Sequence, residues 1–253
     1  MDLELPMDKV SLGSNNTPDD SKINVVLVAT GSFNPPTFMH LRMFELARDA
    51  LHSEGYHVVA AYMSPVSDAY KKQSLISGEH RLRMCNLASE SSDFIMVDPW
   101  EANQSTYQRT LTILKRIESY FIDNKRLISR GSCLFVVLIY SNHLAYLDFG
   151  LLSRFYVLQS MLFGWKVRTI CREYGVVCIC REGQDVEKII SDNEILNENR
   201  SNIKVVDELV SNSISSTRLR YCISRGLSIK YLTIDGVIEY IREHRLYMNS
   251  IEK

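Results

Sequence analysis

A histidine lies beside a glycine and two prolines near the start of the chain, in the run GSFNPPTFMH at residues 31–40. The run follows an apolar stretch, residues 25–29, and precedes a helix-like pattern that begins near Leu41. A buried strand therefore ends in a turn that opens onto a helix, whose unpaired N–H groups and dipole attract phosphate. Gly31 lets the backbone approach a ligand closely. These residues predict a nucleotide-phosphate site with His40 beside it.

A second run, ISSTRLR at residues 214–220, places hydroxyl groups at the start of a helix. Arg220 lies one turn after Thr217, so its guanidinium and the Thr217 hydroxyl can converge on one anion. The alternative is an ordinary Ser/Thr helix cap followed by a solvated basic face. A third cluster, Tyr70-Lys71-Lys72, lies in a polar loop and offers Lys72 as a further cation.

Alternating strand and helix patterns must position these three runs. The pattern predicts strands at residues 24–30, 57–63, 94–97, 134–140, 176–180 and 203–206. It predicts helices at residues 37–53, 77–89, 106–121, 186–191, 215–225 and 233–244, and one that ends at residues 170–174. Such alternation is typical of an α/β fold with a Rossmann-like, doubly wound, mostly parallel sheet and helices on both faces. Ligands bind such sheets at the carboxyl ends of the strands, where the first run lies.

Composition sets limits on partners and compartment. The 253 residues include 29 Lys and Arg against 30 Asp and Glu, so no bulk charge points to nucleic acid or to an anionic membrane. The six cysteines show no CxxC pair and no zinc spacing, which fits a reducing compartment, cytoplasmic or nuclear. Cys178 and Cys180 are expected to be small core residues of one strand. Residues 1–22 are polar and without periodicity, so we expect a flexible tail with no signal peptide, followed by a single domain over residues 23–248.

The three runs together resemble the eukaryotic, plant-like nicotinamide/nicotinate mononucleotide adenylyltransferases of the (H/T)xGH nucleotidyltransferase superfamily. GSFNPPTFMH reads as that superfamily's G-x-F-x-P-x-T-x-x-H form, and ISSTRLR as the companion I-S-S-T-x-x-R signature. The segments SPVSDAYKKQSL, DPWEANQSTYQRTL and SIKYLTIDGVIEYIREHRLY resemble the same family. The resemblance is close over residues 23–121 and 167–247.

This resemblance implies a reaction in which ATP and nicotinamide or nicotinate mononucleotide give NAD, or its deamido form, and pyrophosphate. It implies Mg²⁺, held mainly by the ATP phosphates, with no metal site of the protein's own, and it leaves a homo-oligomer open. The catalytic residues would be His40 and Arg220. The residues that bind ATP and its phosphates would be Gly31, Ser32, Phe33, His40, Lys72, Ser215, Thr217, Arg218, Leu219 and Arg220. The residues that bind the mononucleotide or NAD would be Gly31, Ser32, Tyr70, Lys72, Trp100, Tyr107, Thr110, Arg181 and Asn212.

Tyr107 is the nearer match to the family's stacking aromatic residue, and its alternative role is that of a helix-face residue.

The resemblance stops in an atypical apolar segment, residues 127–166. The family carries a Gly-x-Asp turn after the strand there, whereas this chain has Ser141-Asn142-His143. We interpret the segment as the product of a variant transcript or an altered gene model, which sequencing of the messenger RNA would test. Its length would also permit a membrane span, but Asn142, His143 and Asp148 interrupt it and argue against a membrane as partner.

Three other functions stay open at this point. The chain could be a catalytically impaired relative that binds nucleotides or acts as a chaperone. It could adenylylate another phosphate acceptor, such as phosphopantetheine, although SPVSDAYKK and ISSTRLR argue against that acceptor. It could be tethered to a membrane through residues 134–152.

Overall fold

The central sheet has the strand order of a Rossmann fold. The computed structural model describes residues 3–11, 23–123, 133–140, 164–180, 186–210 and 212–248. In this part of the chain, six strands form one sheet in the order β3-β2-β1-β4-β5-β6, and every neighbouring pair is parallel. The order reverses between β1 and β4, and such switch points are where doubly wound sheets bind ligands. The predicted fold class is confirmed.

The strands are β1 (Ile23–Gly31), β2 (Tyr56–Pro65), β3 (Ile95–Val97), β4 (Cys133–Tyr140), β5 (Gly175–Cys180) and β6 (Ile203–Asp207). The helices are α1 (Phe38–Ser53), α2 (Gly78–Ser89), α3 (Thr110–Asp123), α5 (Gly164–Glu173), α6 (Val186–Asp192), α7 (Glu194–Glu198), α8 (Ser216–Ser224) and α9 (Asp235–Glu243). A short 3₁₀ turn, η2 (Arg200–Asn202), precedes β6.

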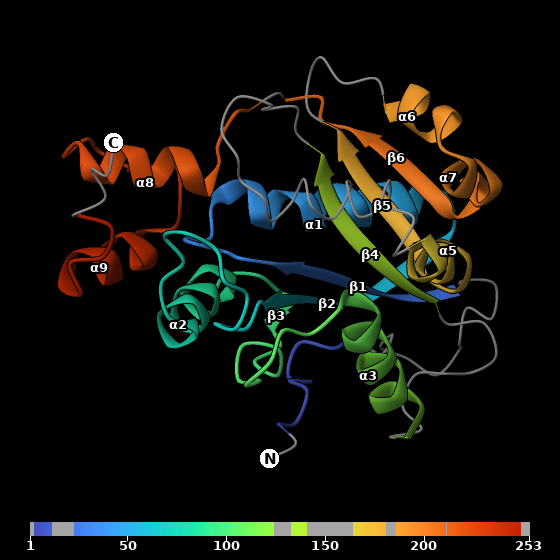
Figure 1. Ribbon diagram of the computed structural model, residues 1–253, viewed down its shortest axis with the longest axis horizontal. Helices are drawn as coiled ribbons and strands as arrows, with labels where there is room; N and C mark the ends of the chain where they lie inside the picture. The colour runs from blue at the N-terminus through green and yellow to red at the C-terminus, as the bar shows by residue number, and fades with distance from the viewer. Residues whose placement is uncertain are drawn as a thin grey trace.

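Both faces of the sheet are covered by helices (Figure 1). Alternate residues of β1 divide between two cores, because successive side chains of a strand point to opposite faces. Leu27 packs in a cluster with Phe44 of α1, whereas Val28 packs in a cluster with Leu114 of α3. Cys178 and Cys180 are buried in a third cluster with α5, α6 and α7, as the sequence predicts.

Helices α8 and α9 lie at one end of the molecule, next to α2 (Figure 1). They form a fourth cluster with it, in which Leu219 of α8 and Ile238 of α9 pack against Met84 of α2. This packing holds the ISSTRLR run close to the end of β1. The sequence alone could not place α8, because nothing local specifies which helix it contacts.

Two helices begin later than their patterns predict. Helix α3 begins at Thr110 rather than at residue 106, because the Gln108 amide bonds back to the Thr106 carbonyl (3.1 Å) and closes a local turn. Helix α9 begins at Asp235 rather than at residue 233, after Ile234, whose backbone is extended. The short α7 and η2 have no sequence signal, since five and three residues are too few to show periodicity.

The N-terminal strap, which we define as residues 3–11, packs on the sheet. Leu5 is 2% exposed and belongs to the cluster with α3. The Tyr62 hydroxyl donates to the Pro6 carbonyl (2.7 Å), and the Ser11 N–H donates to the Val59 carbonyl (2.9 Å). The prediction of a flexible tail is therefore wrong for these residues, because isolated apolar side chains in a polar segment carry no periodic signal. Residues 12–22 lie outside the described residues.

The atypical apolar segment contributes β4, which pairs with β1 and β5 in the middle of the sheet. The predicted strand at residues 134–140 is thus confirmed, and the membrane tether through residues 134–152 would need the same residues. The remainder of the segment up to residue 163 lies outside the described residues. Among the described helices, none is long and apolar enough to cross a bilayer.

Candidate active site

Three loops follow the carboxyl ends of β1, β2 and β3. The motif turn comprises residues 31–37, the lysine loop residues 66–77 and the aromatic loop residues 98–109. Parallel neighbours end at one edge of a sheet, so these loops lie together. The lysine loop contacts both others. The Val66 N–H donates to the Gly31 carbonyl (2.9 Å), and the Ser67 hydroxyl donates to the Gln104 carbonyl (2.6 Å).

Side chains from the C-terminal region hold three successive carbonyls of the motif turn. Arg220 donates to the Asn34 carbonyl (2.7 Å). Ser216 donates to the Pro35 carbonyl (2.7 Å), and Thr233 donates to the Pro36 carbonyl (2.9 Å). These bonds bring the two motifs together, because carbonyls of a turn have no strand or helix partners of their own and accept from side chains instead.

The buried side chain of Asn34 anchors the motif turn through two hydrogen bonds. Its amide donates to the Ser74 carbonyl of the lysine loop (2.7 Å), and its side-chain oxygen accepts from the Tyr247 hydroxyl (2.8 Å). Burial raises the pKa of the Tyr247 phenol, so this group keeps its proton and donates throughout the physiological range. The turn is thereby fixed to the lysine loop and to the C-terminal region.

Gly31 and Phe33 fit each other closely within the motif turn. A Cβ added to Gly31 would lie 3.2 Å from the Phe33 ring, so a side chain there would displace the ring. Phe33 has a φ of +45°, a conformation that non-glycine residues rarely adopt. Its ring is 3% exposed and stands edge-on to the His40 ring at 5.2 Å. The positions assigned to phosphate binding are therefore tightly packed.

The tautomer of His40 follows from its contact with Thr37, the residue that caps α1. The Thr37 backbone N–H donates to Nδ1 of His40 (3.0 Å). A backbone N–H can only donate, so Nδ1 accepts and the neutral ring carries its proton on Nε2. The Thr37 hydroxyl also lies 2.8 Å from Nδ1. His40 is therefore oriented by the start of its own helix, with Nε2–H as its donor.

Two further cations lie beside the motif turn. The Lys72 ammonium is 3.4 Å from the Ser32 hydroxyl, and Arg220 donates to the Thr217 hydroxyl (3.5 Å) as well as to the turn. Ser215 caps α8 by accepting from the Arg218 N–H (3.3 Å). These groups form a cluster suited to a polyanion.

Arg218 and Leu219 differ from the expectation for phosphate contacts. The Arg218 guanidinium donates to the Ser213 hydroxyl. Leu219 is fully buried in the cluster with α2 and α9, and its N–H donates to the Ser215 carbonyl (3.0 Å) within the helix. The assignment of Leu219 to phosphate binding is therefore wrong, since neither its side chain nor its N–H is available to a ligand.

Two tyrosines stack across the lysine and aromatic loops. The rings of Tyr70 and Tyr107 lie 5.4 Å apart at an interplanar angle of 30°. Tyr107 is 43% exposed and precedes α3, so the alternative of a helix-face residue is excluded. Thr110 follows as the first residue of α3. Exposed stacked rings of this kind can receive a further planar ring.

Trp100, the other aromatic residue assigned to the mononucleotide, lies next to the ion pair of Asp98 and Arg116. Asp98 is fully buried and contacts Arg116 of α3 (3.1 Å), and it also accepts from the Trp100 N–H (3.1 Å). Burial raises the pKa of the Asp98 carboxyl, and the Arg116 charge opposes that rise. The Arg116 guanidinium lies 5.1 Å from the centre of the Trp100 ring, within cation–π range.

Asn212 lies between the two motif-bearing segments. Its amide donates to Glu208 (2.6 Å) and contacts the Met39 sulfur (3.3 Å), next to His40. Its oxygen accepts from the Ile214 N–H (3.1 Å) and shapes the approach to α8. Arg181 lies outside the described residues.

Arg81 of α2 is the central residue that sequence patterns missed. Its side chain is fully buried and donates to the Ser32 carbonyl (3.2 Å), the Val66 carbonyl (2.7 Å) and the Asp68 carboxylate (2.8 Å). A fourth bond goes to the Ile76 carbonyl (2.9 Å). A buried guanidinium with four partners ties the motif turn to both ends of the lysine loop. In the sequence, its only signal is a charge among the core positions of α2.

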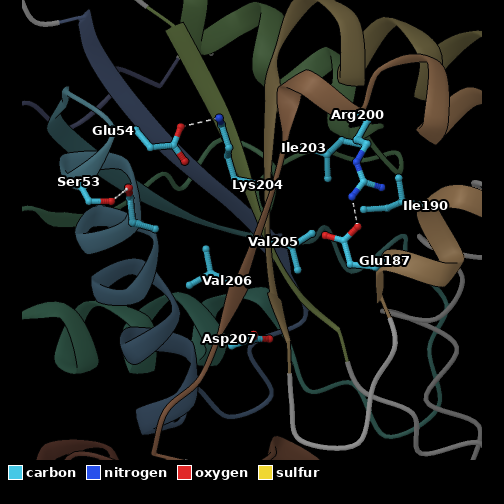
Figure 2. Close-up of a pocket in the computed structure, with 11 residues that line it drawn as sticks. Ser53, Glu54, Glu187, Ile190, Arg200, Ile203, Lys204, Val205, Val206 and Asp207 are labelled. Carbon is cyan, nitrogen blue, oxygen red and sulfur yellow. Dashed lines mark hydrogen bonds and ion pairs between the residues drawn. The ribbon is translucent and has the colours of Figure 1, made fainter.

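A separate groove of about 430 Å³ runs along β6, the edge strand, between α1 and α6. Figure 2 shows the ion pair of Lys204 with Glu54 (2.5 Å) and that of Arg200 with Glu187 at its rim. Neither the motif turn nor the lysine loop contributes to the groove. Of these charged residues Lys204 lies on the edge strand itself, where a lysine opposes pairing with a further strand.

Comparison with known proteins agrees with the geometry. The cytidylyltransferase-like family model matches residues 28–221. A nicotinamide/nicotinic acid mononucleotide adenylyltransferase of Arabidopsis thaliana is 59% identical over 98% of each chain. This chain belongs to the eukaryotic nicotinamide/nicotinic acid mononucleotide adenylyltransferase family. A rice member, from Oryza sativa subsp. japonica, is 53% identical over 98% of this chain and 96% of its own.

Solved structures support the fold of this adenylyltransferase family member. A Plasmodium falciparum nicotinic acid mononucleotide adenylyltransferase complexed with NaAD matches with a TM-score of 0.58 at 16% identity, over 90% of this chain and 100% of that one. The same enzyme complexed with APC matches with a TM-score of 0.57 at 14% identity, over 90% and 99%. At such identities the likeness establishes the Rossmann-like fold.

Proposed function

We propose that this chain transfers the adenylyl group of ATP to the 5′-phosphate of nicotinamide or nicotinate mononucleotide, giving NAD or its deamido form and pyrophosphate. The observation that carries the proposal is the bond from Arg220 to the Asn34 carbonyl, which joins the two nucleotidyltransferase motifs at the end of β1. The family membership of the chain supports the choice of substrates.

In this reaction, a phosphate oxygen of the mononucleotide attacks the α-phosphorus of ATP in line. A bond forms from that oxygen to phosphorus, and the bond to the bridging oxygen of pyrophosphate breaks. The attacking phosphate is already anionic, so the enzyme need not supply a base, and no covalent enzyme intermediate is required. Positioning and stabilisation of charge therefore account for most of the catalysis.

We assign His40 to the transferring phosphate, where its Nε2–H would donate to an oxygen that gains charge in the transition state. The Thr37 N–H on Nδ1 supports this role, because it keeps the ring in the donating tautomer without a reorganisation step. Arg220 and Thr217 would bind the β- and γ-phosphates and stabilise the departing pyrophosphate. Lys72, beside Ser32, would bind phosphate from the opposite side.

We propose that the divalent cation of the reaction is Mg²⁺ and that it enters with ATP. Within the described residues, no group of three His, Cys, Asp or Glu side chains could hold a metal ion. Lys72 and Arg220 beside the motif turn are cations. Such donors suit the phosphates rather than a cation. The cation would neutralise charge on the ATP phosphates when bound.

The decisive experiment is an assay of NAD formation with purified protein, ATP, Mg²⁺ and each mononucleotide. We expect product with at least one mononucleotide and none when EDTA replaces Mg²⁺. ATP binding by calorimetry without product would favour the catalytically impaired relative, for which Ser141-Asn142-His143 in place of Gly-x-Asp is the motivating observation. Product with phosphopantetheine alone would overturn the choice of acceptor.

A further inference from the structure

The N-terminal strap is connected to the aromatic side of the site through one arginine. Arg116 of α3 contacts three groups at once: the Leu3 carbonyl of the strap, the buried Asp98 carboxylate and the face of the Trp100 ring. Asp98 in turn accepts from the Trp100 N–H. The Arg116 side chain is 17% exposed, so it is enclosed by these partners rather than solvated.

The strap has several other attachments besides its bond to Arg116. Leu5 is buried in the cluster with α3, and the Pro6 carbonyl accepts from the buried Tyr62 hydroxyl. Lys9 donates to the Ser89 carbonyl (2.7 Å), near the end of α2, and to the Ile95 carbonyl (3.2 Å). The strap is therefore a fixed element of the fold. Its Leu3 carbonyl accepts a hydrogen bond from the Arg116 guanidinium and so restricts the orientation of that group.

We infer that the N-terminal strap, acting through Arg116, positions Trp100 against the base of the mononucleotide and so sets affinity for that substrate. A guanidinium offers several N–H donors in a rigid plane, and bonds to Leu3 and Asp98 together leave it one orientation over the ring. Without the Leu3 carbonyl, Arg116 can turn about its bonds to Asp98, and the ring loses its cation–π partner. Arg116 is a positioning residue in this scheme. The inference rests on the proposed function only in naming the mononucleotide.

Two variants and one control test it. Deletion of residues 1–4 removes the Leu3 carbonyl but keeps Leu5, and Arg116→Lys keeps a cation for Asp98 but lacks the planar fork. We expect both variants to raise the KM for the mononucleotide by about tenfold, with the KM for ATP and kcat changed by less than about twofold. The matched control is Lys9→Met, which weakens the strap elsewhere and should lower Tm without a change in either KM.

A spectroscopic readout separates positioning from stability. In a Trp165→Phe background, Trp100 is the remaining tryptophan, and we expect deletion of residues 1–4 to shift its emission and Lys9→Met to leave it unchanged. An unchanged mononucleotide KM in Arg116→Lys, or an equal rise in the KM for ATP, would overturn the inference. If the parent forms no product with either mononucleotide, the proposed function fails, and the emission of Trp100 still decides whether the strap positions it.

Discussion

The phosphate side and the aromatic side of the site are built in different ways. On the phosphate side, the carbonyls of Asn34, Pro35 and Pro36 each accept a bond from a side chain of the C-terminal region. On the aromatic side, Tyr70 and Tyr107 stack on each other, and Tyr107 is 43% exposed. The difference matches the two proposed tasks: charge stabilisation requires donors fixed in advance, whereas a planar base can stack on the exposed face of a tyrosine pair.

The strongest test of the phosphate side is His40→Ala. We expect kcat to fall by about a hundredfold to a thousandfold, the loss typical of one preorganised donor to a developing charge. Steady-state kinetics with saturating ATP and mononucleotide would measure it. The matched control is His52→Ala, an exposed histidine of the same helix, which should retain parental rates. A near-parental kcat in His40→Ala would remove His40 from the mechanism.

Arg220→Met removes both the proposed phosphate ligand and the bond to the Asn34 carbonyl. We expect kcat/KM for ATP to fall by about a hundredfold, because a charged donor and its positioning effect are lost together. Arg225→Met, at the end of the same helix and exposed, is the control. If kcat/KM for ATP falls equally in both variants, the loss comes from disturbed packing of α8 rather than from a missing contact with ATP.

Arg81→Met tests whether the buried Arg81 side chain, which bonds to two loops, is required for the binding of both substrates. We expect the KM values for ATP and the mononucleotide to rise together, by about tenfold, because Arg81 bonds to the motif turn and to the lysine loop at once. The variant should also have a lower Tm, since four hydrogen bonds of a buried group are lost. Arg83→Met, exposed on the same helix, should change neither quantity. A rise confined to one substrate would show that Arg81 serves only one loop.

Tyr107→Ala should affect the aromatic side alone. We expect the KM for the mononucleotide to rise about fivefold, because its base loses one stacking partner. The KM for ATP should stay unchanged. Tyr107→Phe keeps the ring and should behave as the parent. A rise with Phe as large as that with Ala would mean that the hydroxyl, rather than the ring, binds the substrate.

The smallest effect is expected in the groove along β6. Lys204→Met breaks the ion pair with Glu54, which lies away from the motif turn. Partly exposed pairs of this kind contribute about 1 kcal/mol or less, so Tm should shift only slightly and both KM values should stay parental. A kinetic change would connect this groove to the site, which the proposed mechanism does not include.

The sequence by itself determined the order of the main strands and helices along the chain, the two motifs and the cations proposed to bind phosphate. These signals are local: apolar periodicity identifies elements, and the spacing of Gly31, His40 and Arg220 identifies chemistry. It also placed the site, because the carboxyl ends of parallel strands share one edge.

Tertiary structure alone decided which side chains hold the site in place. Arg81 reads as an ordinary helix charge, and only burial against the turn and the lysine loop makes it a tie between them. Leu219 lies within a binding motif yet belongs to the core, because α8 packs on α2 and α9. The strap reads as a tail, and only its contacts with Tyr62 and Arg116 order it. In each case the deciding contacts join residues far apart in sequence, and neither periodicity nor composition records such contacts.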